Sequence, residues 1–277
     1  MQNPIILAVA VTFFYNRVRL VYLDKASSHF AELADRVHVH IVTNTHDEEE
    51  RDSIRSVMRD KGVTFSIHAP TLLGHPFLLP WCHFDIFREL FVRDASITHF
   101  MYLEDDILVT AKNMEYWLKG RDELRAFGLI PSFLRYEKAH DGVLYITDVI
   151  KREAFQSMPK AWVHEGYCYI NMAYPYQGMY LLDRELMEEH LTSRSSNPEC
   201  NKWAIREAAA QGLTFMHVPD GYYSRNLVGY KAKERQIDPV CLIHHIPNKY
   251  VNDRHSVYGK ISYGDLVEDI EPGTSHS

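Results

Sequence analysis

The chain has 277 residues, which is enough for one large domain or two small ones. Hydrophobic residues make up 46% and charged residues 24%, with 13 glycines and 12 prolines, and this composition excludes disordered, collagenous and coiled-coil proteins. Lysine and arginine number 30 against 37 aspartates and glutamates. The net charge of −7 argues against a protein that follows the nucleic-acid backbone, so we expect no nucleic-acid partner.

The cysteines and the N-terminus bear on the cellular compartment. No two of the four cysteines form a CxxC pair, which argues against a zinc cluster and a disulfide framework and favours a reducing compartment. They are Cys82, Cys168, Cys200 and Cys241. The apolar run 5–11 is too short to span a bilayer and has no basic flank before it. We therefore expect a cytoplasmic protein without a signal peptide or membrane anchor.

Apolar runs of strand length alternate with amphipathic segments, a pattern typical of an α/β fold with a mainly parallel sheet. The first strands are expected over 5–11, 37–42 and 63–67. Ser27 and Ser28 are expected to cap a short helix that follows at 30–34. A capping box from Thr45 to Glu48 predicts a second helix, which ends at Gly62.

The pattern continues through the rest of the chain. Further helices are expected over 78–92 and around 114–118, and further strands over 97–103, 143–150 and 213–218. Residues 162–180 are rich in Tyr and Trp and predict loops and short strands. Asn197 followed by Pro198 predicts a helix start, and that helix continues to Gly212.

Three consecutive acids, Glu104, Asp105 and Asp106, directly follow the strand expected over 97–103. Alternate side chains of an extended segment share a face, so Glu104 and Asp106 are expected to point one way and Asp105 the other. The carboxyl end of a central strand is where open α/β sheets bind ligands. Carboxylate oxygens suit Mg²⁺ or Mn²⁺, ions that also bind a substrate's phosphate oxygens. The structural alternative is a solvated acidic loop.

The segment 102–107, Tyr-Leu-Glu-Asp-Asp-Ile, resembles the Asp-x-Asp motif of the GT-A glycosyltransferases, which use nucleotide-sugar donors. The resemblance implies an α/β, Rossmann-like GT-A fold with a mainly parallel central sheet. It implies one catalytic domain over 1–277, with a nucleotide-sugar-binding half at 1–110 and an acceptor-binding half and tail at 111–277. It also implies that Asp106 ligates Mn²⁺ or Mg²⁺, and that Glu104, which replaces the usual first Asp, completes the donor site with Asp105.

Two further segments resemble the family's acceptor side and catalytic base. The segment 177–182, with Gly178 and the nearby Tyr176, resembles the glycine-containing acceptor loop, although a plain turn before a helix opened by Asp183 fits equally well. Glu199 stands where inverting members carry the catalytic base. The alternative is an acid placed at a helix start for its favourable interaction with the helix dipole. The rivals for the base are Asp183 and Glu165.

The last segment of interest is the apolar run 240–246, which contains His244 and His245. GT-A members often complete the metal site with a late histidine, and the resemblance assigns this role to His244. The two imidazoles should face opposite ways in an extended segment, so at most one is a ligand, and either can instead be a core histidine. Lys249 is a candidate for binding the donor diphosphate.

The sequence therefore predicts a metal-dependent glycosyltransferase that moves a sugar from a nucleotide-sugar to the hydroxyl of a glycan or other acceptor, with inversion. One alternative is a metal-dependent phosphohydrolase, for which His38-x-His40 has a suitable spacing. Another is a non-catalytic carbohydrate-binding protein that stacks aromatic side chains on sugar rings. Its candidates are Trp81, Trp162, Tyr174 and Tyr176.

Overall fold

The computed structural model describes residues 4–199 and 204–267. The chain forms two compact units, which are described in turn. The first comprises residues 1–114 and 178–213, and the second comprises 115–177 and 214–277. The chain passes from one unit to the other after Met114, Gln177 and Leu213.

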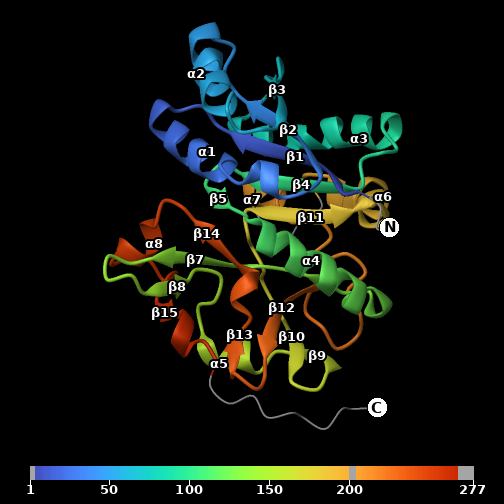
Figure 1. The fold of residues 1–277 in the computed structure, drawn as a ribbon, viewed down its shortest axis with the longest axis vertical. Coiled ribbons are helices and arrows are strands. Elements are labelled where there is room, and N and C mark those ends of the chain that lie inside the picture. Colours follow the sequence, from blue (N-terminus) through green and yellow to red (C-terminus); the bar gives the residue numbers. More distant parts are fainter. Residues whose placement is uncertain (1–3, 200–203, 268–277) are drawn as a thin grey trace. The chain divides into compact units, whose positions relative to one another are not determined.

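The first unit contains a five-stranded sheet in the order β11-β4-β1-β2-β3 (Figure 1). Its strands are β1 (Ile6–Phe13), β2 (Arg36–Thr43), β3 (Thr64–His68), β4 (His99–Glu104) and β11 (Met179–Asp183). β1 to β4 are parallel and β11 is antiparallel to β4. All eight residues of β1 are buried, as expected for a central strand covered on both faces. The predicted α/β fold with a mainly parallel sheet is confirmed.

The strand order changes direction between β1 and β4. The chain runs outward from β1 through β2 to β3 and then crosses back to place β4 on the other side of β1. Such a reversal is a topological switch point, where open α/β sheets leave a crevice at the carboxyl ends of the strands. Thr12 of β1 pairs with Glu104 of β4, so the segments after these two strands start side by side.

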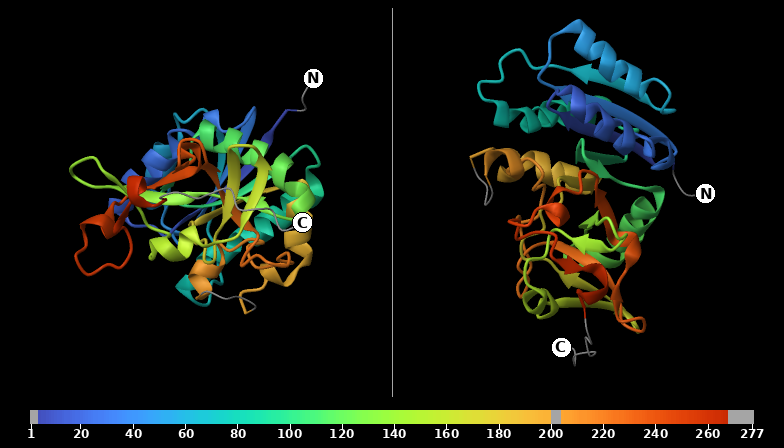
Figure 2. Two further views of the ribbon diagram at one scale, coloured as in Figure 1. Left: turned by 90° about the horizontal axis from the view of Figure 1, so that it is seen from below. Right: turned by 90° about the vertical axis from the view of Figure 1, so that its left-hand side faces the viewer.

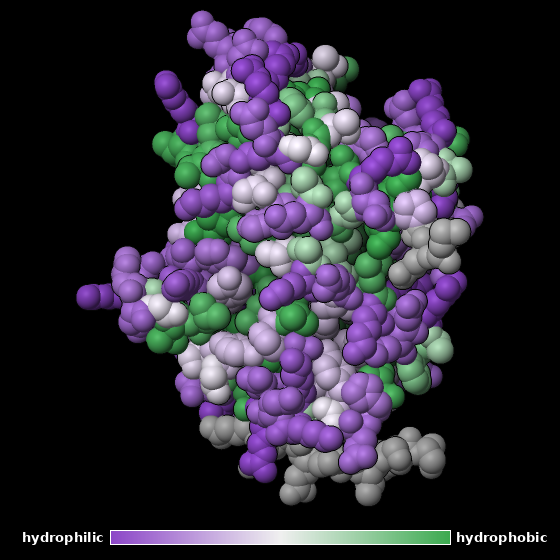
Figure 3. Space-filling model, in the orientation of Figure 1, coloured by the Kyte–Doolittle hydropathy of each residue, from purple (hydrophilic) through white to green (hydrophobic). Residues whose placement is uncertain are grey.

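Helices pack along this sheet, with α1 beside α2 and α3 beside α6 (Figures 1 and 2). The helices are α1 (Leu20–Ser27), α2 (Glu48–Met58), α3 (His83–Arg93), α6 (Arg184–Thr192) and α7 (Ile205–Ala208). The outer side of α2 is hydrophilic (Figure 3). The opposite side of the helix contributes the buried residues Ile54 and Met58. In the residues that the structure describes, no helix has the length and apolarity needed to cross a bilayer.

Two predicted helix starts are wrong. Ser27 is the last residue of α1 and does not begin the next helix, because residues 30–32 form only a turn of 3-10 helix. The N-cap of α2 is Asp47, whose side chain accepts a 3.0 Å hydrogen bond from the backbone N–H of Glu50. Thr45, the expected cap, instead donates its hydroxyl to the carboxylate of Glu50.

The segment 197–218 also departs from expectation. α7 begins at Ile205 with Ala204 as its N-cap, and residues 200–203 of the predicted helix lie outside the described part of the chain. The predicted strand over 213–218 is wrong, since this segment forms turns and bends. The backbone is left-handed at Gly212 (φ +52°) and His217 (φ +47°), and these conformations interrupt an extended chain.

The second unit contains two mainly antiparallel sheets, ordered β13-β12-β10-β9, with β6 paired to β12, and β15-β8-β7-β14. The first has β6 (Ile130–Pro131), β9 (Lys160–His164), β10 (Tyr167–Asn171), β12 (Asn226–Lys231) and β13 (Gln236–Ile237). The second has β7 (Leu134–Lys138), β8 (Leu144–Ile146), β14 (Leu242–His245) and β15 (Ile261–Ser262). The helices are α5 (Arg152–Gln156), α8 (Lys249–Asn252) and α4 (Ala111–Leu124), which leads into this unit.

Candidate active site

The acidic motif lies where β4 ends. Glu104 is the last residue of β4, and Asp105 and Asp106 form a turn before the short strand β5 (Ile107–Leu108). Both aspartates are buried. The expected alternation of the three side chains is wrong, because the two aspartates have left the strand and their carboxylates converge on one partner.

That partner is Arg19, which lies in the connection from β1 to α1, within a 3-10 turn over Arg17–Arg19. Its Nε donates to Oδ2 of Asp105 at 2.8 Å, and its Nη2 donates to Oδ1 of Asp105 at 2.5 Å. The same Nη2 donates to Oδ2 of Asp106 at 3.0 Å. One guanidinium thus connects the segments that follow β1 and β4, the two strands of the switch point.

Burial and charge act in opposite directions on Asp105. Loss of hydration raises the pKa of its carboxyl to about 7, while the hydrogen bonds and positive charge of Arg19 act to lower it. Burial acts to lower the pKa of Arg19, but the two aspartates outweigh this effect and raise it. Arg19 therefore favours the ionised form of the Asp105 carboxyl against the effect of its burial.

Gly178 lies directly beside the acidic motif. Its carbonyl accepts a 2.9 Å hydrogen bond from the backbone N–H of Glu104, at the point where β11 begins to pair with β4. The backbone of Gly178 is left-handed (φ +65°), and a Cβ placed there would lie 3.0 Å from Oε2 of Glu104 and 3.2 Å from Cγ1 of Ile107. A residue without a side chain is needed at this position.

The proposed base and its rivals lie in turns or at a helix start. Glu199 is exposed in a turn, where its N–H donates to Oδ1 of Asn197 at 2.9 Å, and residues 200–203 of the expected helix lie outside the described part of the chain. Asp183 is the N-cap of α6, as predicted, and accepts from the N–H of Leu186 at 2.8 Å. Glu165 is exposed in the turn between β9 and β10.

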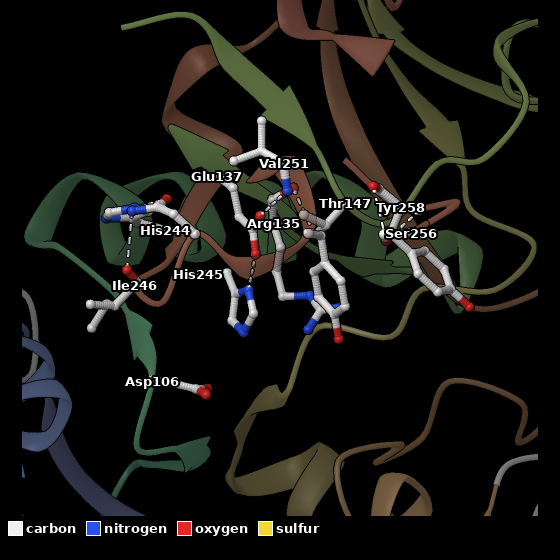
Figure 4. Close-up of polar contacts among 12 residues, drawn as sticks. Asp106, Arg135, Glu137, Thr147, His244, His245, Ile246, Val251, Ser256 and Tyr258 are labelled. Carbon is white, nitrogen blue, oxygen red and sulfur yellow. Dashed lines mark hydrogen bonds and ion pairs between the residues drawn. The ribbon is translucent and has the colours of Figure 1, made fainter. Parts of the chain in front are cut away.

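The two late histidines of β14 have different partners within the second unit (Figure 4). The half-buried His244 contacts Oδ1 of Asn248 through Nε2 at 3.0 Å and stacks on Tyr136, with ring centroids 4.9 Å apart. His245 is buried, and its Nδ1 lies 2.6 Å from Oε1 of Glu137. The two rings therefore have different surroundings, and they point in different directions in Figure 4.

Glu137 on β7 holds His245 in one orientation. Its carboxylate is fully buried, and its second oxygen accepts a 2.7 Å hydrogen bond from the backbone N–H of Val251. An acceptor-only carboxylate at Nδ1 requires the proton there, so Nε2 of a neutral His245 carries the lone pair. Metal-ligating histidines are commonly oriented by a carboxylate in this way.

The other expected site residues of the second unit are Tyr176 and Lys249. The guanidinium of Arg135 lies over the ring of Tyr176, 4.8 Å from its centroid, and is held by the buried carboxylate of Asp148 through an Nε–Oδ1 hydrogen bond of 2.8 Å. Lys249 begins α8 and is exposed, with its Nζ 4.9 Å from the centroid of the Tyr250 ring.

Residues invoked for the two alternative functions are partly committed to the fold. Trp81 is 7% exposed, stacks on Phe84 and donates its indole N–H to the carbonyl oxygen of Ile205 at 2.6 Å, so it is a core residue and not a sugar platform. His38 and His40 lie within β2 and contact Thr64 and His68 of the neighbouring strand.

The residues that the structure describes include no group of three His, Cys, Asp or Glu side chains arranged to hold a metal ion. The hard oxygen donors of the acidic motif nevertheless fit Mg²⁺ or Mn²⁺ chemically. Asp105 binds Arg19 through both carboxylate oxygens, whereas Asp106 binds it through Oδ2. Asp106 is therefore the better candidate for a metal ligand.

The structure brings Glu104, Asp105, Asp106 and Gly178 together in the first unit, and Glu199 lies elsewhere in that unit. Sequence reasoning missed Arg19 and Glu137, which hold these acids and His245. A basic residue soon after the first strand was the available signal for Arg19. No comparable pattern marks Glu137, because it alternates with apolar residues like any strand residue.

No protein-family model matches the chain, and no curated protein matches it. Among solved structures, a crystal structure of an active-site mutant of LgtC shares 15% identity, with 78% of this chain and 71% of that chain covered and a TM-score of 0.39. A structure of the galactosyltransferase LgtC with donor and acceptor sugar analogues also shares 15% identity, with 76% and 70% covered and a TM-score of 0.34. TM-scores this low do not establish a shared fold.

Proposed function

We propose that the protein is a metal-dependent glycosyltransferase that moves a sugar from a nucleotide-sugar donor to an acceptor hydroxyl. The observation that carries the proposal is the acidic motif at the switch point of a mainly parallel sheet, with the backbone of Gly178 against Glu104. Ligands of open α/β sheets bind at this point, and hard carboxylates there suit a cation that accompanies a diphosphate.

Each residue of the motif has a proposed role. Asp106 holds the divalent cation, which when bound screens the diphosphate charge and stabilises it as a leaving group. Glu104 is proposed to help bind the donor, and the hydrogen bond to Gly178 fixes its backbone. Gly178 is proposed for the acceptor side, because a position without a side chain lets the acceptor approach the backbone. Tyr176 is proposed for the acceptor side and Lys249 for the diphosphate. A single catalytic domain and a cytoplasmic location stay predictions.

A late histidine is also proposed as a ligand of a divalent cation. The resemblance gives this role to His244, but the contact of Nε2 with Asn248 occupies that nitrogen. The buried Glu137 orients His245 as a carboxylate orients a metal-binding imidazole, so the geometry of this unit favours His245.

Glu199 stays the proposed general base of an inverting reaction. Such a base takes the acceptor's proton in the transition state, which typically contributes about 10²- to 10⁴-fold to the rate. Glu199→Gln should therefore lower kcat with little change in donor affinity, measured by initial rates and by nucleotide binding. A product whose anomeric configuration, determined by NMR, is the same as that of the donor would defeat the assignment.

The test of the proposed function is incubation with a panel of nucleotide-sugars, with and without Mn²⁺. We expect metal-dependent transfer or slow hydrolysis of one donor, abolished by Asp106→Asn. The matched control is Asp85→Asn, which alters a carboxylate that is 88% exposed on α3. Cleavage of simple phosphoesters would favour a phosphohydrolase, and sugar binding without turnover would favour a carbohydrate-binding protein. Full metal-dependent activity of Asp106→Asn would exclude the metal role of this motif.

A further inference from the structure

The acidic motif already has a positively charged partner within the protein, the side chain of Arg19. The carboxylates of Asp105 and Asp106, which directly follow Glu104 in the chain, meet the guanidinium of Arg19 at the switch point. The side chains of Asp105 and Asp106 are 6% and 7% exposed, and that of Arg19 is 32% exposed. Two buried carboxylates this close together stay ionised together only where a cation compensates their charge.

Arg19 binds the two aspartates unequally. Nε and Nη2 of Arg19 donate to Oδ2 and Oδ1 of Asp105 at 2.8 and 2.5 Å, respectively. This parallel two-bond geometry makes arginine–carboxylate pairs strong. The contact with Asp106 is a single bond from the same Nη2, at 3.0 Å. A ligand that competes for these carboxylates therefore displaces Arg19 from Asp106 more readily than from Asp105.

We propose that Arg19 is a positioning residue that serves as the resident counter-ion of the motif and competes with the divalent cation for Asp106. It keeps Asp105 in a structural ion pair, outside the metal's coordination sphere, and it gives up its bond to Oδ2 of Asp106 when the cation binds. The inference rests on the proposed function, since it assigns Asp106 to the cation.

This arrangement has two opposite consequences for a variant without the guanidinium. Without a divalent cation, Arg19→Gln leaves two buried aspartates uncompensated and lowers the melting temperature. With Mn²⁺ present, the same variant binds the ion more tightly, because a positive charge close to the ligand has been removed. A merely structural arginine predicts only the first effect.

The experiment measures Mn²⁺ binding to the full chain by electron paramagnetic resonance and the melting temperature with and without Mn²⁺. We expect Arg19→Gln to bind Mn²⁺ about tenfold more tightly than the native chain and to gain more in melting temperature from it. Arg19→Lys loses the two-bond geometry but keeps the positive charge. Because the charge is kept, the Mn²⁺ affinity of this variant should stay near the native value. The matched control is Arg88→Gln, which breaks an exposed arginine–aspartate pair on α3.

A second variant covers the case in which Arg19→Gln does not fold. Arg19→Gln combined with Asp105→Asn removes one charge of each sign and leaves Glu104 and Asp106 as the carboxylates. We expect this double variant to melt above the single variant and to bind Mn²⁺ more tightly than the native chain. Loss of that binding on adding Asp106→Asn would place the ion at Asp106.

The outcomes separate this inference from the proposed function. Native binding that depends on Asp106 but is unchanged or weaker in both arginine-to-glutamine variants would overturn the role of Arg19 and leave the proposed function standing. Absence of Mn²⁺ binding from the native chain and from both variants would overturn the metal dependence of the proposed function, and the inference with it.

Discussion

At the scale of single residues, Gly178 packs closely against Glu104 in the acidic motif. The left-handed backbone of Gly178 and the 3.0 Å approach of a built Cβ to Oε2 of Glu104 are separate constraints. The first costs about 1 kcal/mol for an alanine, as for other non-glycine residues in this region. The second forces the Glu104 carboxylate to move, which changes the acidic motif itself.

We therefore expect Gly178→Ala to lower the free energy of unfolding by about 1–3 kcal/mol and to reduce metal-dependent activity. The measurements are urea denaturation and the transfer assay. The matched control is Gly221→Ala, because Gly221 also has a left-handed backbone (φ +84°) but no atom within 4 Å of a built Cβ. Equal losses of activity in both variants would show that the contact with Glu104 does not matter.

At the scale of elements, β14 carries two histidines in different environments. Replacing each by alanine should therefore lower the free energy of unfolding by a different amount. Alanine at the buried His245 leaves the Glu137 carboxylate without this donor, at a cost of about 1–3 kcal/mol. Alanine at His244 removes a stacking contact with Tyr136 at the edge of the core and should cost about 1 kcal/mol.

If His245 is the cation ligand, His245→Ala should also raise the Mn²⁺ concentration for half-maximal activity by about 10- to 100-fold, and His244→Ala should leave it nearly unchanged. Metal titration of the transfer assay measures this requirement. Glu137→Gln separates orientation from ligation, since it keeps the imidazole and should raise the requirement less than His245→Ala. A larger effect at His244 would restore the assignment that the resemblance gives.

The elements also show where local patterns suffice. The strands β1 and β4 are apolar runs, and burial on both faces makes such runs visible in a sequence. β2 is visible by its alternation instead, because it buries Val37, Val39 and Ile41 and leaves the residues between them partly exposed. α1 was missed because it has no side-chain cap and follows Arg17 and Arg19, which resemble a solvated loop. The apolar segment 213–218 was misread as a strand, because hydrophobicity does not reveal the left-handed backbone at Gly212 and His217.

At the scale of the whole molecule, local sequence patterns do not predict how the chain divides into two units. The predicted halves meet at residue 110, near Met114, where the chain first leaves the first unit. Residues 178–213 then return to the first unit, where β11 pairs with β4 and brings Gly178 to Glu104. This pairing joins residues about 75 positions apart, and its energy is spread over strand hydrogen bonds and burial that no short motif encodes.

The stability of the first unit should depend on pH through two buried histidines. His83 lies between the carbonyl of Pro80 and the hydroxyl of Tyr180, and His190 contacts the hydroxyl of Ser195 through Nδ1 at 2.6 Å. Burial lowers the pKa of each imidazole to about 3, and for His190 the proximity of His83 is a smaller part of that lowering. Both are therefore neutral in the folded protein at neutral pH.

A histidine with a folded pKa of about 3 takes up a proton on unfolding when the pH lies between that value and its ordinary value of 6.5. The stability it contributes is complete above pH 6.5 and is lost as the pH falls, by about 1.4 kcal/mol per pH unit for each histidine. His190→Gln, which keeps a polar group for Ser195 but does not titrate, should flatten the dependence of unfolding free energy on pH by about this amount between pH 6 and 4. Urea unfolding at a series of pH values measures the slope, with His255→Gln at an exposed site as the control. A slope unchanged by His190→Gln would mean that His190 is not held neutral by the fold.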